Sequence, residues 1–136
     1  MEITVSTEQG NVPVTVIHLS GDLDASNYEE VIHKVKELAE SGAKDFVIDL
    51  GKVPFMSSAG LVSLHTVAMM LRGEKPADPE SGWTALKSID RSRESGMQKH
   101  VKLLSPQPGV AETFDKAGFT QFFEIFNDLR SAVASF

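Results

Sequence analysis

The stretch FVIDLGKVPFMSSAGLVSL, residues 46–64, joins a short apolar run to a segment with helical spacing. The run at 45–50 is β-branched and almost continuously apolar, which is typical of a strand buried in a sheet flanked by helices. A helix is predicted to begin at Ser57 or Ser58 and to run to about Leu71 along one apolar stripe. The stretch therefore predicts a strand, a loop with two serines and a helix.

The same alternation extends over most of the chain. Strands are predicted at 2–7 and 12–20, as a hairpin around a Gly-containing turn, and then at 45–50, 100–105 and 122–126. Helices are predicted after the Ser26 region, after Ser57, over 106–118 and over 127–136. Strands that alternate with helices imply a mostly parallel sheet with right-handed crossovers.

The ends of the first helix carry recognisable signals. Ser26 and Glu29 have the spacing of a capping box, in which each side chain bonds the other residue's main-chain amide. Gly42 stands where a glycine ends a helix.

Composition and charge exclude several classes of function. The 136 residues fit one domain, 1–136, with 41% hydrophobic and 24% charged residues. There is no cysteine, which excludes a thiolate metal site and a cysteine nucleophile. The net charge of −6 disfavours binding to nucleic acid and to anionic lipid.

The sequence also predicts a location. The N-terminal MEITVSTEQG has no basic segment followed by an apolar one, and no apolar run approaches the ~20 residues that span a bilayer. We therefore expect a cytoplasmic protein without a membrane segment.

Residues 73–98 differ in character from the rest. They are rich in glycine, proline and charged side chains, and are long for a connection in a compact domain. Trp83, Leu86 and Ile89 could line a short helix within them. We expect an insertion that is either functional or mobile.

The sequence gives little support for a catalytic or a nucleotide-binding function. The nearest histidine, His65, lies seven residues after Ser58, or ~10 Å along a helix, too far for a hydrogen bond. His18, His33 and His100 are isolated in the sequence, and no helical histidine pair has metal spacing. We expect each to be a surface histidine or a structural one with its hydrogen bonds satisfied. The motif SSAG lacks the lysine and second glycine of a phosphate loop. We expect neither an enzyme nor a bound cofactor.

The acidic residues and the two serines each allow a structural and a functional interpretation. Asp22 and Asp24 could form a cation or phosphoryl site, but a helix cap explains them more simply. Asp49 lies near the carboxyl end of its strand, the end where open α/β sheets carry functional loops. Ser57 and Ser58 could be a helix cap, or a site where a phosphate meets free amides and the positive end of the helix dipole.

Three stretches together carry a family resemblance. HLSGDLDASNYEEV (18–31), FVIDLGKVPFMSSAGLVSL (46–64) and HVKLLSPQPGVAETFDKAGFTQFFEIF (100–126) resemble the STAS domain of anti-sigma-factor antagonists. The resemblance covers nearly the whole chain except 73–98. It implies an α/β fold with a four- to five-stranded mixed sheet, in which an N-terminal hairpin precedes parallel strands, and about four helices.

The resemblance also implies a bacterial signalling function. Members of this kind bind a serine kinase that is also an anti-sigma factor, and so release a sigma factor for transcription. The kinase uses its own ATP to phosphorylate a serine, which ends the interaction, and a phosphatase resets it. On the family pattern Met-Asp-Ser-Ser-Gly-Leu the phosphoacceptor falls on Ser58, and less favourably on Ser57. Partner contacts are implied at Asp22, Asp24, Ser57, Ser58, Gly60 and Leu61.

Two departures leave an alternative open. Ser57 stands where many members carry Asp, so recognition by the kinase can differ, and 73–98 replaces a short connection. The alternative is a phosphorylation-independent STAS adaptor in a larger signalling or transport assembly, with Ser58 only as a cap. We expect a monomer or a weak dimer.

Overall fold

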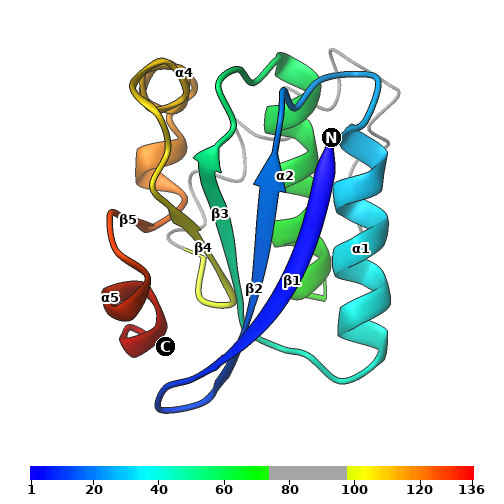
Figure 1. Ribbon diagram of the computed structural model, residues 1–136, viewed down its shortest axis with the longest axis vertical. Helices are drawn as coiled ribbons and strands as arrows, with labels where there is room; N and C mark the ends of the chain where they lie inside the picture. Colours follow the sequence, from blue (N-terminus) through cyan, green and yellow to red (C-terminus); the bar gives the residue numbers. More distant parts are fainter. Residues whose placement is uncertain (74–97) are drawn as a thin grey trace.

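The computed structural model describes residues 1–73 and 98–136. The helix considered around Trp83, Leu86 and Ile89 lies outside the described residues. The elements in chain order are β1 (Glu2–Gln9), β2 (Pro13–Ser20), α1 (Tyr28–Glu40), β3 (Phe46–Lys52), α2 (Ser58–Leu71), β4 (Val101–Leu104), α4 (Pro108–Ala117), the 3₁₀ helix η3 (Phe119–Gln121), β5 (Ile125–Phe126) and α5 (Leu129–Ala134) (Figure 1).

The five strands form one sheet in chain order, β1-β2-β3-β4-β5. Strand β1 pairs with β2 antiparallel, and every later neighbour pair is parallel. The predicted mixed sheet, with an N-terminal hairpin before parallel strands, is confirmed.

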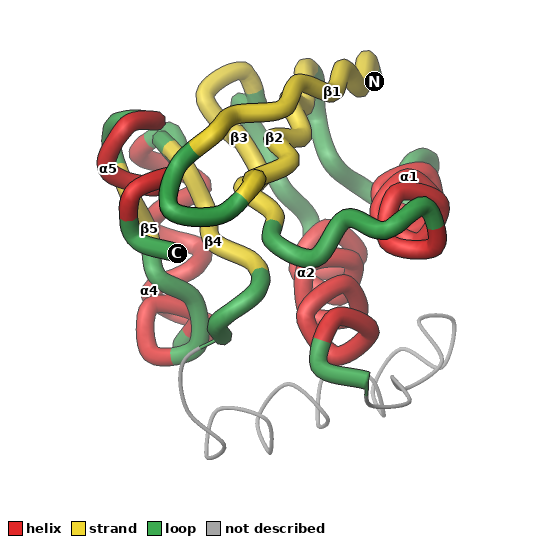
Figure 2. Tube along the Cα trace, turned by 90° about the horizontal axis from the view of Figure 1, so that it is seen from below, coloured by secondary structure: helices red, strands yellow, loops and turns green. Residues whose placement is uncertain are grey.

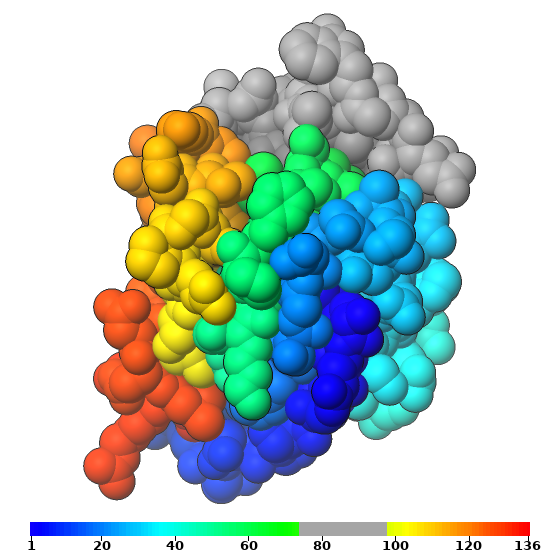
Figure 3. All heavy atoms as spheres, turned by 45° about the horizontal axis from the view of Figure 1, so that its top comes forward, coloured from blue at the N-terminus to red at the C-terminus, as the bar shows by residue number. Residues whose placement is uncertain are grey.

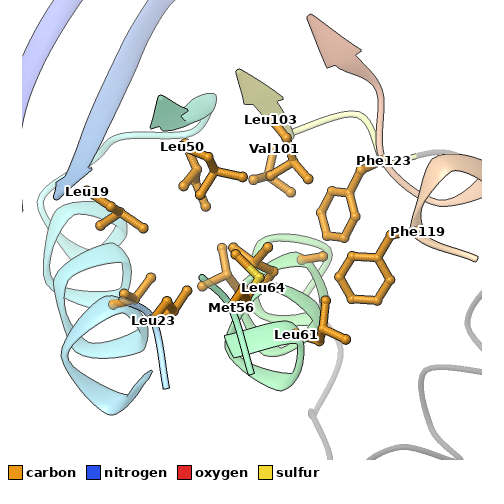
Figure 4. Close-up of a cluster of buried hydrophobic side chains, with 14 of the residues drawn as sticks. Leu19, Leu23, Leu50, Met56, Leu61, Leu64, Val101, Leu103, Phe119 and Phe123 are labelled. Carbon is orange, nitrogen blue, oxygen red and sulfur yellow. The ribbon is translucent and has the colours of Figure 1, made fainter. Parts of the chain in front are cut away.

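One face of the sheet is covered by α1 and α2, with the α4–η3 region completing the same core (Figures 2 and 4). Consecutive parallel strands joined by right-handed crossovers place their helices on one side, which explains this arrangement. The largest fully buried side chains of this core come from β2, β3, β4, α2, α4, the loop after β2 and the aromatic residues after α4: Ile17, Leu19, Leu23, Phe46, Ile48, Leu50, Leu64, Leu103, Phe114, Phe119, Phe122 and Phe123.

The opposite face is covered by α5 over part of its area. A second, smaller cluster there joins valines of β2 and β3 to α5, and consists of Val14, Val16, Val47, Leu104, Ala132 and Val133. The same face continues toward the other ends of β1–β3 with polar side chains, including Thr4, Ser6, His18 and Asp49.

Helix α2 is buried more completely than its sequence pattern predicts. All ten residues from Gly60 to Met69 are buried, not only the expected stripe. They include His65, which is 1% exposed. Its ring is tilted by 48° against that of Phe122 with 5.7 Å between the ring centroids, and its two nitrogens have no hydrogen-bond partner among the described residues.

Of the two signals predicted for the ends of α1, the capping box at its start is wrong and the glycine at its end is confirmed. The helix begins at Tyr28 and no side chain caps it, because the Ser26 amide and hydroxyl both donate to the Asp24 carboxylate instead. At the other end Gly42 has φ of 111°, its amide donates to Ala39 O at 3.1 Å, and Ala43 N donates to Leu38 O at 3.1 Å. These two bonds are the Schellman pattern that favours glycine.

The predicted strand at 122–126 is mostly wrong, since only Ile125 and Phe126 pair with β4. Phe122 and Phe123 follow the 3₁₀ turn and are both buried, with their rings edge to face at 4.9 Å between centroids. Two adjacent aromatic side chains cannot both enter one core from a flat strand, whose side chains alternate between faces.

The loops after β2 and β3 are joined by main-chain hydrogen bonds. Leu23 N donates to Phe55 O at 3.0 Å and Ser57 N donates to Leu23 O at 2.9 Å, which makes a short parallel bridge between Leu23 and Met56. Gly60, in the first turn of α2, lies against this bridge. A Cβ there would meet Met56 Cγ at 2.5 Å and Leu23 O at 3.0 Å.

In the described part of the chain, no helix has both the length and the apolar character needed to span a bilayer.

We expect Gly60→Ala to lower the free energy of unfolding by about 1–3 kcal/mol, because the added methyl group must displace Met56 and the Leu23 carbonyl. Gly109→Ala is the matched control, since a Cβ at this helical position meets nothing within 4 Å. That variant should gain about 0.4–1 kcal/mol. Urea unfolding measures both, and equal effects would contradict the close approach at Gly60.

The stability of the protein should fall in mild acid because of His65. Burial, and to a lesser extent the charge of Arg72, lowers the pKa of His65 from 6.5 to about 4. The unfolded chain binds a proton there below about pH 6.5, and the folded chain does so only near pH 4. The unfolding free energy should therefore decrease between pH 7 and pH 4, by about 3 kcal/mol in total.

Urea unfolding at pH 7, 6 and 5 checks this dependence, with His65→Leu as the comparison. The leucine variant keeps an apolar side chain in the same space and should lose most of the slope. If the unfolding free energy of the two proteins falls equally with pH, His65 is not the source of the pH dependence.

Candidate functional site

The two serines of the 54–61 stretch have different surroundings. Ser58 is the first residue of α2 and is exposed. Ser57 precedes it in an extended conformation, with φ of −86° and ψ of 177°, and makes no side-chain capping bond. The Ser57 hydroxyl is buried without a hydrogen-bond partner among the described residues. Only Ser58 presents its side chain to the surroundings of the molecule.

The loop of residues 21–27 lies directly beside this helix start (Figure 3). Within it Asp24 Oδ1 accepts the Ser26 amide at 2.9 Å and the Ser26 hydroxyl, and these bonds hold the pKa of the Asp24 carboxyl below its usual range. Asp24 O accepts the amide of Tyr28 at 2.9 Å. Asp24 therefore orders the loop, and no side chain makes a capping bond at α1.

Asn27, which sequence reasoning did not single out, closes the same loop. Its side-chain amide donates to Asp22 O at 2.8 Å, and its Oδ1 accepts the amide of Asp24 at 3.0 Å. Asp22 itself is exposed. An asparagine just before a helix is a signal for such a turn.

Phe55 was also missed as a candidate, although it stands in the stretch that suggested the site. It is 54% exposed, and its neighbour Pro54 is exposed as well. Met56, the next residue, points into the core (Figure 4). The alternation of side chains in the bridge explains both orientations. We call Pro54, Phe55 and Ser58 the helix-start surface.

Gly60 and Leu61 lie beneath this surface rather than on it. Gly60 is buried, and Leu61 is 8% exposed and belongs to the main core. Their contribution is to seat the first turn of α2 against the Leu23–Met56 bridge. Of the six predicted contact residues, Asp22 and Ser58 are therefore exposed, Asp24 and Ser57 are partly buried, and Gly60 and Leu61 are buried.

Exposed acidic side chains occur in the loop beside this surface and in the first turn of α1. Glu29 and Glu30, in the first turn of α1, are exposed, as is Asp22. Among residues 1–73 and 98–136 no group of three or more histidine and acidic side chains is arranged to hold a metal ion.

His18 and His100, which are isolated in the sequence, each have an aspartate partner in the fold. His18 Nδ1 lies 2.8 Å from Asp49 Oδ2 and its Nε2 lies 2.9 Å from Ser6 Oγ. His100 Nδ1 lies 3.0 Å from Asp45 Oδ1. These partners are distant in sequence and become neighbours only through strand register.

Comparison with known proteins identifies the family of this chain. The model of the STAS domain family matches residues 4–74, just over half of the chain. BtrV of Bordetella bronchiseptica, described as a candidate anti-sigma factor antagonist, is 25% identical over all of this chain and 95% of its own length.

Two solved structures share the fold. A candidate anti-sigma factor antagonist from Thermotoga maritima aligns with a TM-score of 0.70 and 12% identity, over 96% of this chain and 90% of its own. The Bacillus cell fate determinant SpoIIAA, solved in its phosphorylated form, aligns with a TM-score of 0.57 and 16% identity, over 97% and 96%. The five-stranded mixed sheet, the paired loops around the start of α2 and the match of the family model lead to one conclusion: this chain belongs to the STAS domain family.

Proposed function

We propose that this protein is an anti-sigma factor antagonist whose binding to an anti-sigma serine kinase is controlled by phosphorylation of Ser58. The observation that carries the proposal is the exposed Ser58 hydroxyl at the first position of α2, beside an exposed aromatic side chain. The names of the relatives support the same class of function. In this proposal the kinase uses ATP to add the phosphate and a phosphatase removes it, so that this chain is the substrate of both enzymes.

Ser58 is favoured over Ser57 as the acceptor because of accessibility. A kinase must bring the γ-phosphate of ATP in line with the attacking hydroxyl, which requires an open approach. Ser58 is exposed, whereas the Ser57 hydroxyl is buried.

The fold should accept a phosphate at Ser58. The first amides of a helix have no intrahelical acceptor, and the dipole makes this end positive. A phosphate there can accept from free amides, so that the modification is compatible with a folded α2.

A phosphate on Ser58 should destabilise the complex with the partner. The helix-start surface offers an exposed phenylalanine and a proline, which a partner would cover with apolar contacts. A phosphate adds about −1.5 to −2 charges, and burying it beside such contacts without a cationic partner carries a large desolvation cost. We propose that this desolvation cost releases the partner when Ser58 is phosphorylated. The protein would act in the cytoplasm as a monomer or a weak dimer.

Incubation with ATP and an anti-sigma serine kinase that binds this protein should add one phosphate at Ser58, located by peptide mass spectrometry. Ser58→Asp should weaken binding to that kinase about tenfold or more, or ~1.4 kcal/mol. Ser57→Ala is the matched control and should be phosphorylated and bound as the parent protein is. An unmodified Ser58, together with unchanged affinity of Ser58→Asp, would leave the phosphorylation-independent adaptor as the better account.

Phe55→Ala should weaken the same complex about tenfold or more, because exposed aromatic side chains are common anchors of interfaces. Its unfolding free energy should change little, since the side chain is mostly outside the core. Val5→Ala removes another exposed apolar side chain, 40% exposed on β1, and should leave binding unchanged. Calorimetric titration measures both, and equal affinities for the two variants would remove Phe55 from the interface.

A further inference from the structure

Three polar side chains on the partly uncovered face of the sheet form one hydrogen-bonded chain. They come from β1, β2 and β3, on the side opposite α1 and α2. Ser6 Oγ lies 2.9 Å from His18 Nε2, and His18 Nδ1 lies 2.8 Å from Asp49 Oδ2. The other carboxylate oxygen of Asp49 accepts the Gly51 amide at 2.9 Å, which fixes the orientation of this side chain.

The direction of these bonds is set by the chemistry of the partners. An ionised carboxylate can only accept, so in neutral His18 the hydrogen is on Nδ1 and Nε2 accepts from the Ser6 hydroxyl. This is the arrangement in which a histidine acts as a base toward a serine and a carboxylate holds the ring in the required tautomer. Strand register produces it. Asp49 is the register partner of His18 on β3, and Ser6 lies on β1 two residues from Thr4, the partner of His18 on that strand, and therefore on the same face of the sheet.

These three hydrogen-bonded side chains are accessible to a small molecule. The side chains of His18 and Asp49 are 35% and 27% exposed, and Ser6 is partly exposed. A cavity of about 310 Å³ borders the His18 and Asp49 end of this array. It is lined by His18, Asp49 and Lys52 together with Glu2, Thr4, Leu19 and Ser20, and Ser6 lies next to it on the Nε2 side of His18.

We propose that Ser6 is an activated nucleophile that takes an acyl group from small activated esters or thioesters, with His18 as its base. Ser6 Oγ attacks the carbonyl carbon while His18 Nε2 takes the hydroxyl proton. The alcohol or thiol then leaves with that proton, so that one C–O or C–S bond is replaced by a new Oγ–C bond. Asp49 is a positioning residue, and the step needs no oxidant or reductant.

The expected size of the effect follows from the groups present. A positioned general base contributes about 10²–10⁴-fold to a rate. Ser6 should therefore react at least ~100-fold faster than Ser58, an exposed serine of the same chain for which no bonded base is described. This ratio is measured within the unmodified protein and requires no variant.

The experiment treats the full chain with p-nitrophenyl acetate at pH 7.5, follows release of p-nitrophenol and locates acetylated serines by peptide mass spectrometry. We expect acetylation at Ser6 well before Ser58 or Ser20. His18→Gln should slow it about 100-fold, and added imidazole should restore part of the rate in His18→Ala. Circular dichroism and urea unfolding confirm that each variant is folded.

His100→Gln is the matched control, because His100 also pairs with an aspartate and no described serine is bonded to it. It should leave acetylation of Ser6 unchanged. Asp49→Asn should slow acetylation and remove the downfield proton NMR signal of His18 Nδ1–H, which a purely structural role would not link to the rate. Acetylation of Ser6 no faster than that of Ser58, or insensitive to His18→Gln in a folded variant, would overturn the proposal.

Discussion

The structure depends on one topological constraint: its strands lie in the sheet in the order in which they occur in the chain. Parallel neighbours joined by right-handed crossovers must place their helices on the same face, so α1, α2 and α4 share one core. The other face is left to α5, which covers the valines of β2 and β3 but not the polar ends of these strands. The same constraint brings the starts of α1 and α2 to one end of the sheet, where the loops after β2 and β3 meet (Figure 1).

Within that end, the bridge between Leu23 and Met56 sets the direction of each side chain. Because neighbouring residues in an extended segment point to opposite sides, Met56 enters the core and Phe55 faces outward. Gly60 allows the first turn of α2 to lie directly against the bridge. The exposure of Ser58 follows from the position that this close contact gives it. Residue type alone does not explain it, since the hydroxyl of Ser57, one residue earlier, is buried.

Patterns within one segment were predictable from the sequence. The hairpin, the strand at Phe46–Lys52 and the glycine end of α1 follow from alternation, β-branching and backbone freedom, all of which act over a few residues. The start of α1 was predicted wrongly, because Ser26 had two possible partners close in sequence and bonds Asp24 rather than the helix.

Contacts between strands could not be predicted in the same way. The partners of His18 lie 12 and 31 residues away in the chain, and only the register of three strands brings them within hydrogen-bond distance. The same holds for the complete burial of α2, which depends on what packs around it and not on its own apolar stripe. The family motif around Ser58 was visible in sequence because its residues are contiguous, whereas the exposure of Phe55 required the bridge.

The position of Ser58 gives a phosphate two effects of opposite sign, which is what a reversible switch requires. Toward its own chain the phosphate meets the positive end of α2, an interaction typically worth about 0.3–1 kcal/mol in favour of the folded state for a surface charge. Toward a partner it places charge beside Phe55 and Pro54, where desolvation opposes binding. A modification that unfolded the domain would also abolish binding, but its reversal would then require refolding. In the proposed switch the helix start accommodates the charge, so that the free protein would stay folded in both states and only the stability of the complex would change.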